Sequence, residues 1–246
     1  MLIKNTYVFL ALIIVLLTSC AKEGPNGPVG PAGPVVYGNI SGHVTLYDMY
    51  GSKIFANLNK VSIYLNNSSI AINPDTNGYY IYQNEPTGSY SFTVTDSDFA
   101  SSIINNINFV SNTLNQDIKL SRIPDSFITS FKATPASFVD SLYITVLPDS
   151  FGRNRNCIVF VNSFAASNTN FLLSYKVPVP GSARMVSLAV PRQDLLNTGL
   201  ASGAIVYFAA YSYVVNDASV YENPATGAYV YNAVYPNADT ATSVVP

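Results

Sequence analysis

Reactive side chains are scarce in this sequence of 246 residues, which holds two cysteines, Cys20 and Cys157, and a single histidine, His43. A Ser–His–Asp or Cys–His catalytic site would have to use that histidine as its base. His43 lies in an expected strand early in the folded part, whereas Cys157 comes much later in the chain. We therefore expect no catalytic pair and interpret Cys157 as a small buried hydrophobic residue. The few His and Cys residues cannot supply the usual ligands of a zinc site either.

Carboxylates could act in pairs, as they do in glycoside hydrolysis. Asp96 and Asp98 are a candidate acidic pair, but they fall in an expected loop after a strand. The glutamates are Glu23, Glu85 and Glu222. The first lies in an extended segment and the other two lie beside turn prolines. We therefore predict that the chain is not an enzyme and has no catalytic residue.

The segment Asn73-x-Asp75-x-Asn77-Gly78 resembles the first half of a calcium-binding loop. Such a loop needs a bidentate Glu eleven residues after its first ligand, but position 84 is Asn. A tight turn needs only a glycine with positive φ and Asn or Asp side chains that bond nearby amides. We therefore interpret the segment as a turn, and predict no metal site and no cofactor.

Aromatic side chains could bind carbohydrate by stacking, and the chain contains 18 Tyr and 13 Phe but no Trp. The candidate contacts are Tyr207, Tyr211, Tyr213, Tyr229 and Tyr231. The alternative is that these tyrosines fill the core and cover the strand surfaces of a β protein.

Charge is low: 11% of residues are charged, with 12 Lys+Arg against 14 Asp+Glu. Phosphate binding needs clustered Lys and Arg, so we expect no nucleic-acid partner. Abundant Tyr and β-branched residues favour strands. The composition is typical of an exported β protein.

The N-terminal segment has the pattern of a secretory signal. Lys4 precedes an apolar run from Tyr7 to Leu17, which is followed by Thr18, Ser19 and Cys20. A membrane-spanning helix needs about 20 apolar residues, so this run is short for a span.

The sequence Leu17-Thr18-Ser19-Cys20 resembles the lipobox of bacterial lipoproteins. This resemblance implies that residues 1–19 are removed and that the Cys20 thiol carries diacylglycerol, so that membrane lipid is a partner. Two or three acyl chains would anchor the chain stably. Ala21, where inner-membrane lipoproteins have Asp, implies the outer membrane of a Gram-negative cell. The alternatives are an ordinary signal peptide with a chance cysteine, an uncleaved anchor, or a Cys20–Cys157 disulfide.

Residues 20–36 are predicted to form a tether. Four Gly-Pro-X triplets run in register from Gly24 to Val35. Proline fixes φ near the polyproline II value, so we expect an extended spacer rising about 3.1 Å per residue. A short trimeric collagen-like stalk is the alternative.

Residues 37–121 are predicted to form a first β-sandwich because short alternating segments recur between turns. The expected strands are 38–46, 60–65, 79–82, 90–94, 107–110 and 114–120. The segments Ser41-Gly42-x-Val44, Asp75-x-Asn77-Gly78-Tyr79-Tyr80 and Pro86-x-Gly88-x-Tyr90 resemble the carboxypeptidase regulatory-like family. This resemblance implies a transthyretin-like fold without an active site. The stretch between Gly51 and Val61 is longer than the family pattern.

Residues 122–246 are predicted to form a second sandwich, immunoglobulin- or fibronectin III-like, after a linker at 121–126. Expected strands are 141–146, 157–161, 171–177 and 184–190, with a short helix at 191–199. Residues 204–215 form the longest apolar run after the leader and predict a central strand buried on both faces. A turn at 223–227 is expected to let residues 228–234 pair back on the strand at 204–215.

Together these features predict an all-β, non-enzymatic lipoprotein of the cell envelope. Its two tandem sandwiches would serve adhesion, surface display or assembly, with edge strands as contact sites for surface proteins. The alternative is a glycan-binding accessory lipoprotein of a surface polysaccharide-uptake system.

Overall fold

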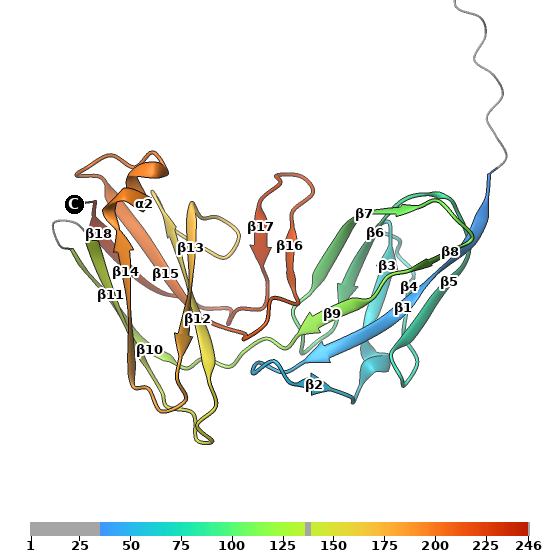
Figure 1. Cartoon of the computed structure of the whole chain (residues 1–246), viewed down its shortest axis with the longest axis horizontal. Coiled ribbons are helices and arrows are strands. Elements are labelled where there is room, and N and C mark those ends of the chain that lie inside the picture. The colour runs from blue at the N-terminus through green and yellow to red at the C-terminus, as the bar shows by residue number, and fades with distance from the viewer. Residues whose placement is uncertain (1–34, 136–138, 246) are drawn as a thin grey trace, which may run out of the picture. The chain divides into compact units, whose positions relative to one another are not determined.

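The computed structural model describes residues 35–135 and 139–245, which belong to one compact unit. Its regular structure is almost entirely β and forms two sandwiches, each around its own hydrophobic cluster (Figure 1). The predicted all-β sandwich fold is therefore confirmed. Within the described ranges, no helix combines the length and apolarity needed to cross a membrane.

The first sandwich is built on the long strand β1 (Tyr37–Tyr47). Its sheet also contains the antiparallel β2 (Lys53–Ile54) and β5 (Tyr79–Pro86) and the parallel β8 (Thr113–Asn115) and β9 (Ile118–Ser121). The facing sheet has the order β4 (Ala71–Ile72), β3 (Ser62–Leu65), β6 (Gly88–Thr95), β7 (Ser102–Phe109). A 3-10 turn, η1 (Leu58–Lys60), occupies the stretch before β3.

Alternation along β1 explains the packing of this sandwich. Ile40, Val44 and Leu46 point into the core and are at most 3% exposed, whereas His43 between them faces outward. Gly42 also lies on the buried face, because a Cβ there would come within 2.1 Å of the carbonyl oxygen of Gln116. The turn between β8 and β9 can therefore approach β1 only at a residue without a side chain.

The second sandwich pairs a three-stranded sheet with a four-stranded one, which is an immunoglobulin- or fibronectin III-like arrangement. The first sheet has the order β10 (Ile128–Pro135), β11 (Val139–Val146), β14 (Met185–Pro191). The second has the order β13 (Leu173–Val179), β12 (Arg155–Asn162), β15 (Ile205–Tyr213), β18 (Asp239–Val244). Helix α2 (Arg192–Asn197) follows β14, and β16 (Val220–Glu222) and β17 (Tyr229–Tyr231) form a separate hairpin.

Several local predictions for this half are confirmed. Strand β15 lies inside its sheet, and every residue from Phe208 to Tyr213 is buried, as expected for a strand covered on both faces. Helix α2 begins directly after Pro191 and ends shortly before Gly199, whose φ of +89° stops it. The turn at 223–227 is also present, but the strand after it, β17, pairs with the short β16 and not with β15 as expected, because β12 and β18 already occupy both sides of β15.

Other elements were not expected from the sequence. Strand β10 escapes detection because its register shifts between Ile128 and Ser130, so that its apolar residues do not alternate simply. Strand β18 is an edge strand with a polar sequence, and Ser243 is its only buried side chain. Strand β7 begins at Ser102, five residues before the expected start at Ile107.

Candidate functional site

The predicted lipid attachment site lies outside the residues that the structure describes. This applies to Leu17, Thr18, Ser19 and Cys20 and to all but the last residues of the tether. Acylation of Cys20 and removal of the leader therefore stay predictions.

The five candidate tyrosines do not form one exposed surface. Tyr213 is fully buried and Tyr211 is 6% exposed, so both belong to the core of the second sandwich. Tyr207 and Tyr231 are half-buried, and the ring centre of Tyr231 lies 6.0 Å from that of Tyr213. Only Tyr229, on the hairpin, is freely exposed, at 59%. As a group these tyrosines mainly pack the protein.

His43 and Cys157 do not form a catalytic pair, because one is exposed on the first sandwich and the other is buried in the second. His43 is exposed on β1, and its ring centre lies 5.4 Å from that of Tyr79 on the neighbouring strand. Cys157 is completely buried in β12, as predicted, and burial raises the pKa of its thiol to about 12. A thiol in that environment stays protonated at neutral pH and is a poor nucleophile.

The segment that resembles half a calcium loop is a turn, as predicted. The carboxylate of Asp75 accepts hydrogen bonds from the backbone amides of Asn77 and Tyr79, both at 2.8 Å. Gly78 has a φ of +85°, and Asn73 donates to the carbonyl oxygen of Val61 at 2.8 Å. In the described part of the chain, no three His, Cys, Asp or Glu side chains gather as metal ligands do.

Asp96 and Asp98 lie at a small cavity of about 140 Å³, together with Lys60 and Arg122. The Asp96 carboxylate accepts a hydrogen bond from the backbone amide of Asp98 at 2.9 Å. This contact is that of a local turn. The expected loop position of the pair is confirmed.

A different site emerges where the segment after β15 meets the first sandwich. Ser219 accepts a hydrogen bond from the backbone amide of Ser121 at 2.9 Å through its hydroxyl oxygen. Asn232 donates to the carbonyl oxygen of Ser101 at 3.0 Å. Ser121 is the first residue of the segment 121–126, which was expected to be a linker. That segment therefore begins at a residue that is hydrogen-bonded to the second half of the chain.

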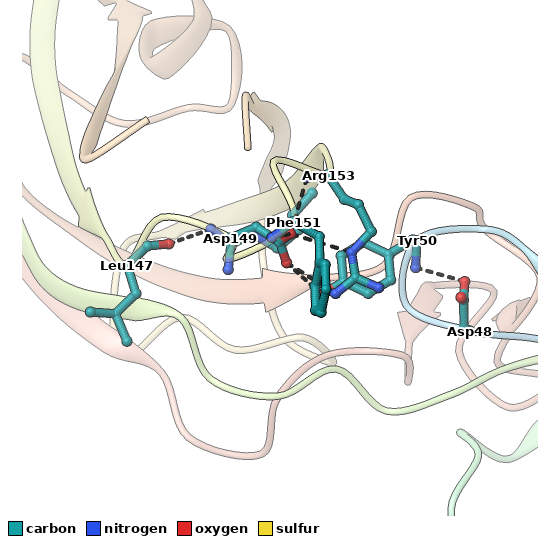
Figure 2. A network of polar contacts seen from close by, with 7 residues as sticks. Asp48, Tyr50, Leu147, Asp149, Phe151 and Arg153 are labelled. Atoms are coloured by element: carbon teal, nitrogen blue, oxygen red, sulfur yellow. Dashed lines mark hydrogen bonds and ion pairs between the residues drawn. The ribbon is translucent and has the colours of Figure 1, made fainter. Parts of the chain in front are cut away.

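A second set of contacts joins the turn after β1 to the loop after β11 (Figure 2). We call Tyr50, Asp149, Phe151 and Arg153 the latch. The Tyr50 hydroxyl donates to the Asp149 carboxylate at 2.8 Å and accepts from the Arg153 guanidinium at 2.7 Å. The guanidinium carbon lies 3.6 Å from the ring centre of Tyr50 and 4.9 Å from that of Phe151, within cation–π distance of both.

Charge in the latch is balanced internally. Hydrogen bonds from Arg153, and then from Tyr50 and Phe151, hold the pKa of Asp149 well below its usual range. Burial and the neighbouring Asp149 raise the pKa of Tyr50. At neutral pH the carboxylate is ionised and the phenol is neutral, which is the combination that their hydrogen bond requires. The latch is therefore suited to holding two loops together rather than to transferring protons.

Beside the hairpin lies a groove of about 470 Å³, which we call the junction groove. Three segments line it: β7 of the first sandwich, the turn from β8 into β9, and the chain that enters β16. Its polar lining residues are Ser102, Asn105, Asn106, Gln116, Asp117, Lys119, Tyr221 and Glu222. Its volume falls in the range of about 300–1,000 Å³ common for ligand sites.

Local backbone geometry shapes this groove. Strand β7 contains a bulge where it pairs with β6, and within that bulge Asn106 has a φ of +58°. A bulge adds a residue and redirects the side chains around it. Ile104 and Ile107 on either side still face the sandwich, so Asn105 and Asn106 are left at its surface.

A larger groove of about 560 Å³ opens between β4 and β5 at another edge of the first sandwich. Its lining is mostly apolar, with Leu65, Ile70 and Ile72. The hydroxyls of its two tyrosines already donate to backbone carbonyl oxygens, Tyr82 to Ile63 at 2.7 Å and Tyr90 to Pro86 at 2.5 Å. It therefore offers fewer free polar groups than the junction groove.

None of the junction-groove residues was predicted from the sequence as a ligand contact. One local signal was available, since two adjacent asparagines interrupt the apolar residues Ile104 and Ile107. Such an interruption within a strand is typical of a bulge. The three segments that form the groove are too far apart in sequence for any local pattern to connect them.

No family model and no curated protein sequence matches this chain. Among solved structures, similarity extends to a proposed carbohydrate-binding protein of Bacteroides uniformis ATCC 8492, with 13% identity, a TM-score of 0.35, and coverage of 83% of this chain and 98% of the other. A DUF3823 family protein of Bacteroides ovatus ATCC 8483 is 10% identical, with a TM-score of 0.33 and coverage of 86% and 100%. A DUF3823 family protein of Parabacteroides merdae ATCC 43184 is 13% identical, with a TM-score of 0.27 and coverage of 81% and 97%.

Proposed function

We propose that this chain is a non-enzymatic lipoprotein of the cell envelope, in which lipid on Cys20 anchors two joined β-sandwiches that act by surface contact. The observation that carries the proposal is the order of features along the chain. An apolar leader ends at Leu17-Thr18-Ser19-Cys20, four Gly-Pro-X triplets follow, and a compact β unit comes next. Ala21 favours the outer membrane, and the spacer keeps the folded part off the lipid surface.

The placement of reactive groups supports a binding role. His43 packs against Tyr79 on an exposed strand, and the Cys157 thiol is buried with a raised pKa. The sandwiches contact each other through the latch and through hydrogen bonds at Ser121 and Asn232. A preformed junction favours binding because less conformational freedom is lost when a partner is engaged. The first sandwich would serve as a carboxypeptidase regulatory-like accessory module.

The test is metabolic labelling of the full chain with an alkyne analogue of palmitate in a Gram-negative host. We expect label on the wild type and on Cys157→Ala, and loss of both label and membrane association in Cys20→Ala. Mass spectrometry of the N-terminal peptide should show a modified Cys20 without residues 1–19. A free thiol at position 20, or an intact leader in the membrane fraction, would refute the anchor.

Glycan binding is the second candidate function. The observation that favours it is the junction groove, where amide, carboxylate, ammonium and phenol side chains line one open space. Sites for small polar ligands combine a few placed hydrogen-bonding groups with aromatic or apolar walls in this way.

A further inference from the structure

We infer that the junction groove binds a neutral carbohydrate, with Tyr221 as the stacking ring and Asn106, Asp117 and Lys119 as hydrogen-bonding groups. This inference rests on the proposed contact function and gives it a ligand class and a place. It concerns residues on β7, in the turn before β9, on β9 and on β16, none of which belongs to the tyrosines first considered from the sequence.

The polar side chains of the groove are available. Asn106, Asp117 and Lys119 are exposed, and one Asp117 oxygen accepts the backbone amide of His43 at 3.0 Å. Within the described residues, the Asn106 amide and the Lys119 ammonium have no hydrogen-bond partner in the protein. An amide both donates and accepts, a carboxylate accepts, and an ammonium donates. Sugar hydroxyls need this mixture because each hydroxyl can donate one hydrogen bond and accept others.

Tyr221 and Ile103 add apolar surface to the same space. Tyr221 is half-buried, so its ring is held by the protein while part of it stays accessible. Aromatic side chains bind well at low entropic cost because few torsions must be fixed. A pyranose ring presents C–H groups on its faces and hydroxyls around its rim, which matches an aromatic wall flanked by polar groups.

The groove is also held in shape before any ligand arrives. Asn105 Nδ2 donates to the carbonyl oxygen of Glu222 at 3.1 Å, which ties β7 to the hairpin. The Gln116 amide donates to the carbonyl oxygen of Asp117 at 3.1 Å and braces the turn before β9. Both walls are thereby fixed by bonds that leave the ligand-facing groups of Asn106 and Lys119 free.

Other ligand classes fit this groove less well. Strand addition by a peptide needs a regular free edge, whereas the bulge at Asn106 breaks the edge of β7 and the bond to Glu222 places β16 beside it. The groove is lined by two carboxylates, those of Asp117 and Glu222, and by one ammonium, that of Lys119, so its net charge disfavours acidic polymers. A neutral glycan is the class that remains compatible with the lining.

The experiment uses the full chain purified from membranes in a detergent without a sugar headgroup, since a glycoside detergent would compete. An array of neutral oligosaccharides, acidic oligosaccharides and extended peptides is screened first. Calorimetry then measures the dissociation constant of the strongest neutral oligosaccharide. We expect Tyr221→Ala to weaken binding about tenfold or more, equivalent to about 1.4 kcal/mol, and Tyr221→Phe to retain most of it.

Tyr37→Ala is the control, because Tyr37 lies at the start of β1, is 53% exposed and does not line the groove. It should leave both binding and the melting temperature unchanged. Folded protein that binds no neutral glycan, that binds only acidic glycans or peptides, or that binds equally well as Tyr221→Ala would overturn the inference. The Cys20 label is measured on the same preparation, so failure of the anchor and failure of the glycan site are told apart.

Discussion

The side-chain amide of Asn105 donates a hydrogen bond to the backbone carbonyl oxygen of Glu222 at 3.1 Å, although 117 residues separate them in the sequence. This bond joins strand β7 of the first sandwich to the β16–β17 hairpin, which follows the central strand of the second. One side chain therefore connects the two sandwiches and shapes one wall of the junction groove.

Replacing Asn105 by Asp should loosen the hairpin, because a carboxylate would face the Glu222 carbonyl oxygen without a proton to donate. A net loss of about 0.5–1.5 kcal/mol is expected for one such bond. Hydrogen exchange should become faster at the amides of β16 and β17 but not in β15. Asn108→Asp, which adds the same charge at an exposed position of β7, should leave hairpin exchange unchanged. Equal exchange in the two variants would contradict the assigned role.

Gly42→Ala should destabilise the first sandwich, since the new Cβ would lie 2.1 Å from the carbonyl oxygen of Gln116. Overpacking of this kind costs about 1–3 kcal/mol. Urea unfolding of the full chain measures the loss. Gly88→Ala is the control because the nearest atom to its Cβ would be 3.9 Å away, in the ring of Tyr90. If both variants unfold at the same urea concentration, the close approach of the β8–β9 turn is wrong.

The latch should make stability depend on pH through Asp149. Its folded-state pKa is depressed, chiefly by the Arg153 hydrogen bond, so its ionised form stabilises the native state above the unfolded pKa of about 3.9. That contribution is lost as the pH falls through the folded-state pKa. The melting temperature of Asp149→Asn should therefore lie below that of the wild type at pH 7, and the difference should shrink below pH 4. Asp125→Asn, an exposed change outside the latch, should match the wild type at pH 7.

Cys157 should resist thiol reagents in the folded protein, because the side chain is fully buried and its pKa is about 12. The measurement uses a Cys20→Ala background, so that Cys157 is the one remaining thiol. The absorbance of the chromophore that a thiol releases from an aromatic disulfide reagent at pH 8 should increase only after urea is added. Adding Ser68→Cys at an exposed turn should give immediate reaction of one thiol. Rapid labelling of Cys157 without urea would show that β12 is not where the structure places it.

Truncation of Tyr213 should destabilise the protein strongly, whereas truncation of Tyr229 should have little effect. Tyr213 is fully buried, and its hydroxyl donates to Asp217 at 2.5 Å. Tyr213→Ala should lower the free energy of unfolding by about 3–5 kcal/mol, as for other large buried aromatics. Tyr229→Ala should change it by less than about 0.5 kcal/mol because the ring is mostly in solvent. Chemical denaturation of both variants tests the contrast, and similar losses would contradict it.

Local pattern was a good guide to secondary structure where one face of a strand is buried. Alternation identified β3 and β6, turn residues at the boundaries identified β1 and β11, and the apolar run at 204–215 identified the doubly covered β15. It failed for β10 and β18, since a register shift or a polar edge position removes the periodic signal. The sequence also could not distinguish the buried from the exposed members of the five candidate tyrosines, because buried and exposed rings alternate along strands in the same way.

The sequence by itself determined the all-β class, most of the strands and the turn at Asp75–Gly78, because these depend on side chains that are neighbours along the chain. It also contains the predicted lipid site at Cys20. Only the tertiary structure decided that Asn105 meets Glu222, that Tyr50 meets Asp149, and that three distant segments enclose the junction groove. Such contacts arise when strand pairing and sheet packing bring remote residues together, and no short-range period of 2 or 3.6 residues encodes that meeting.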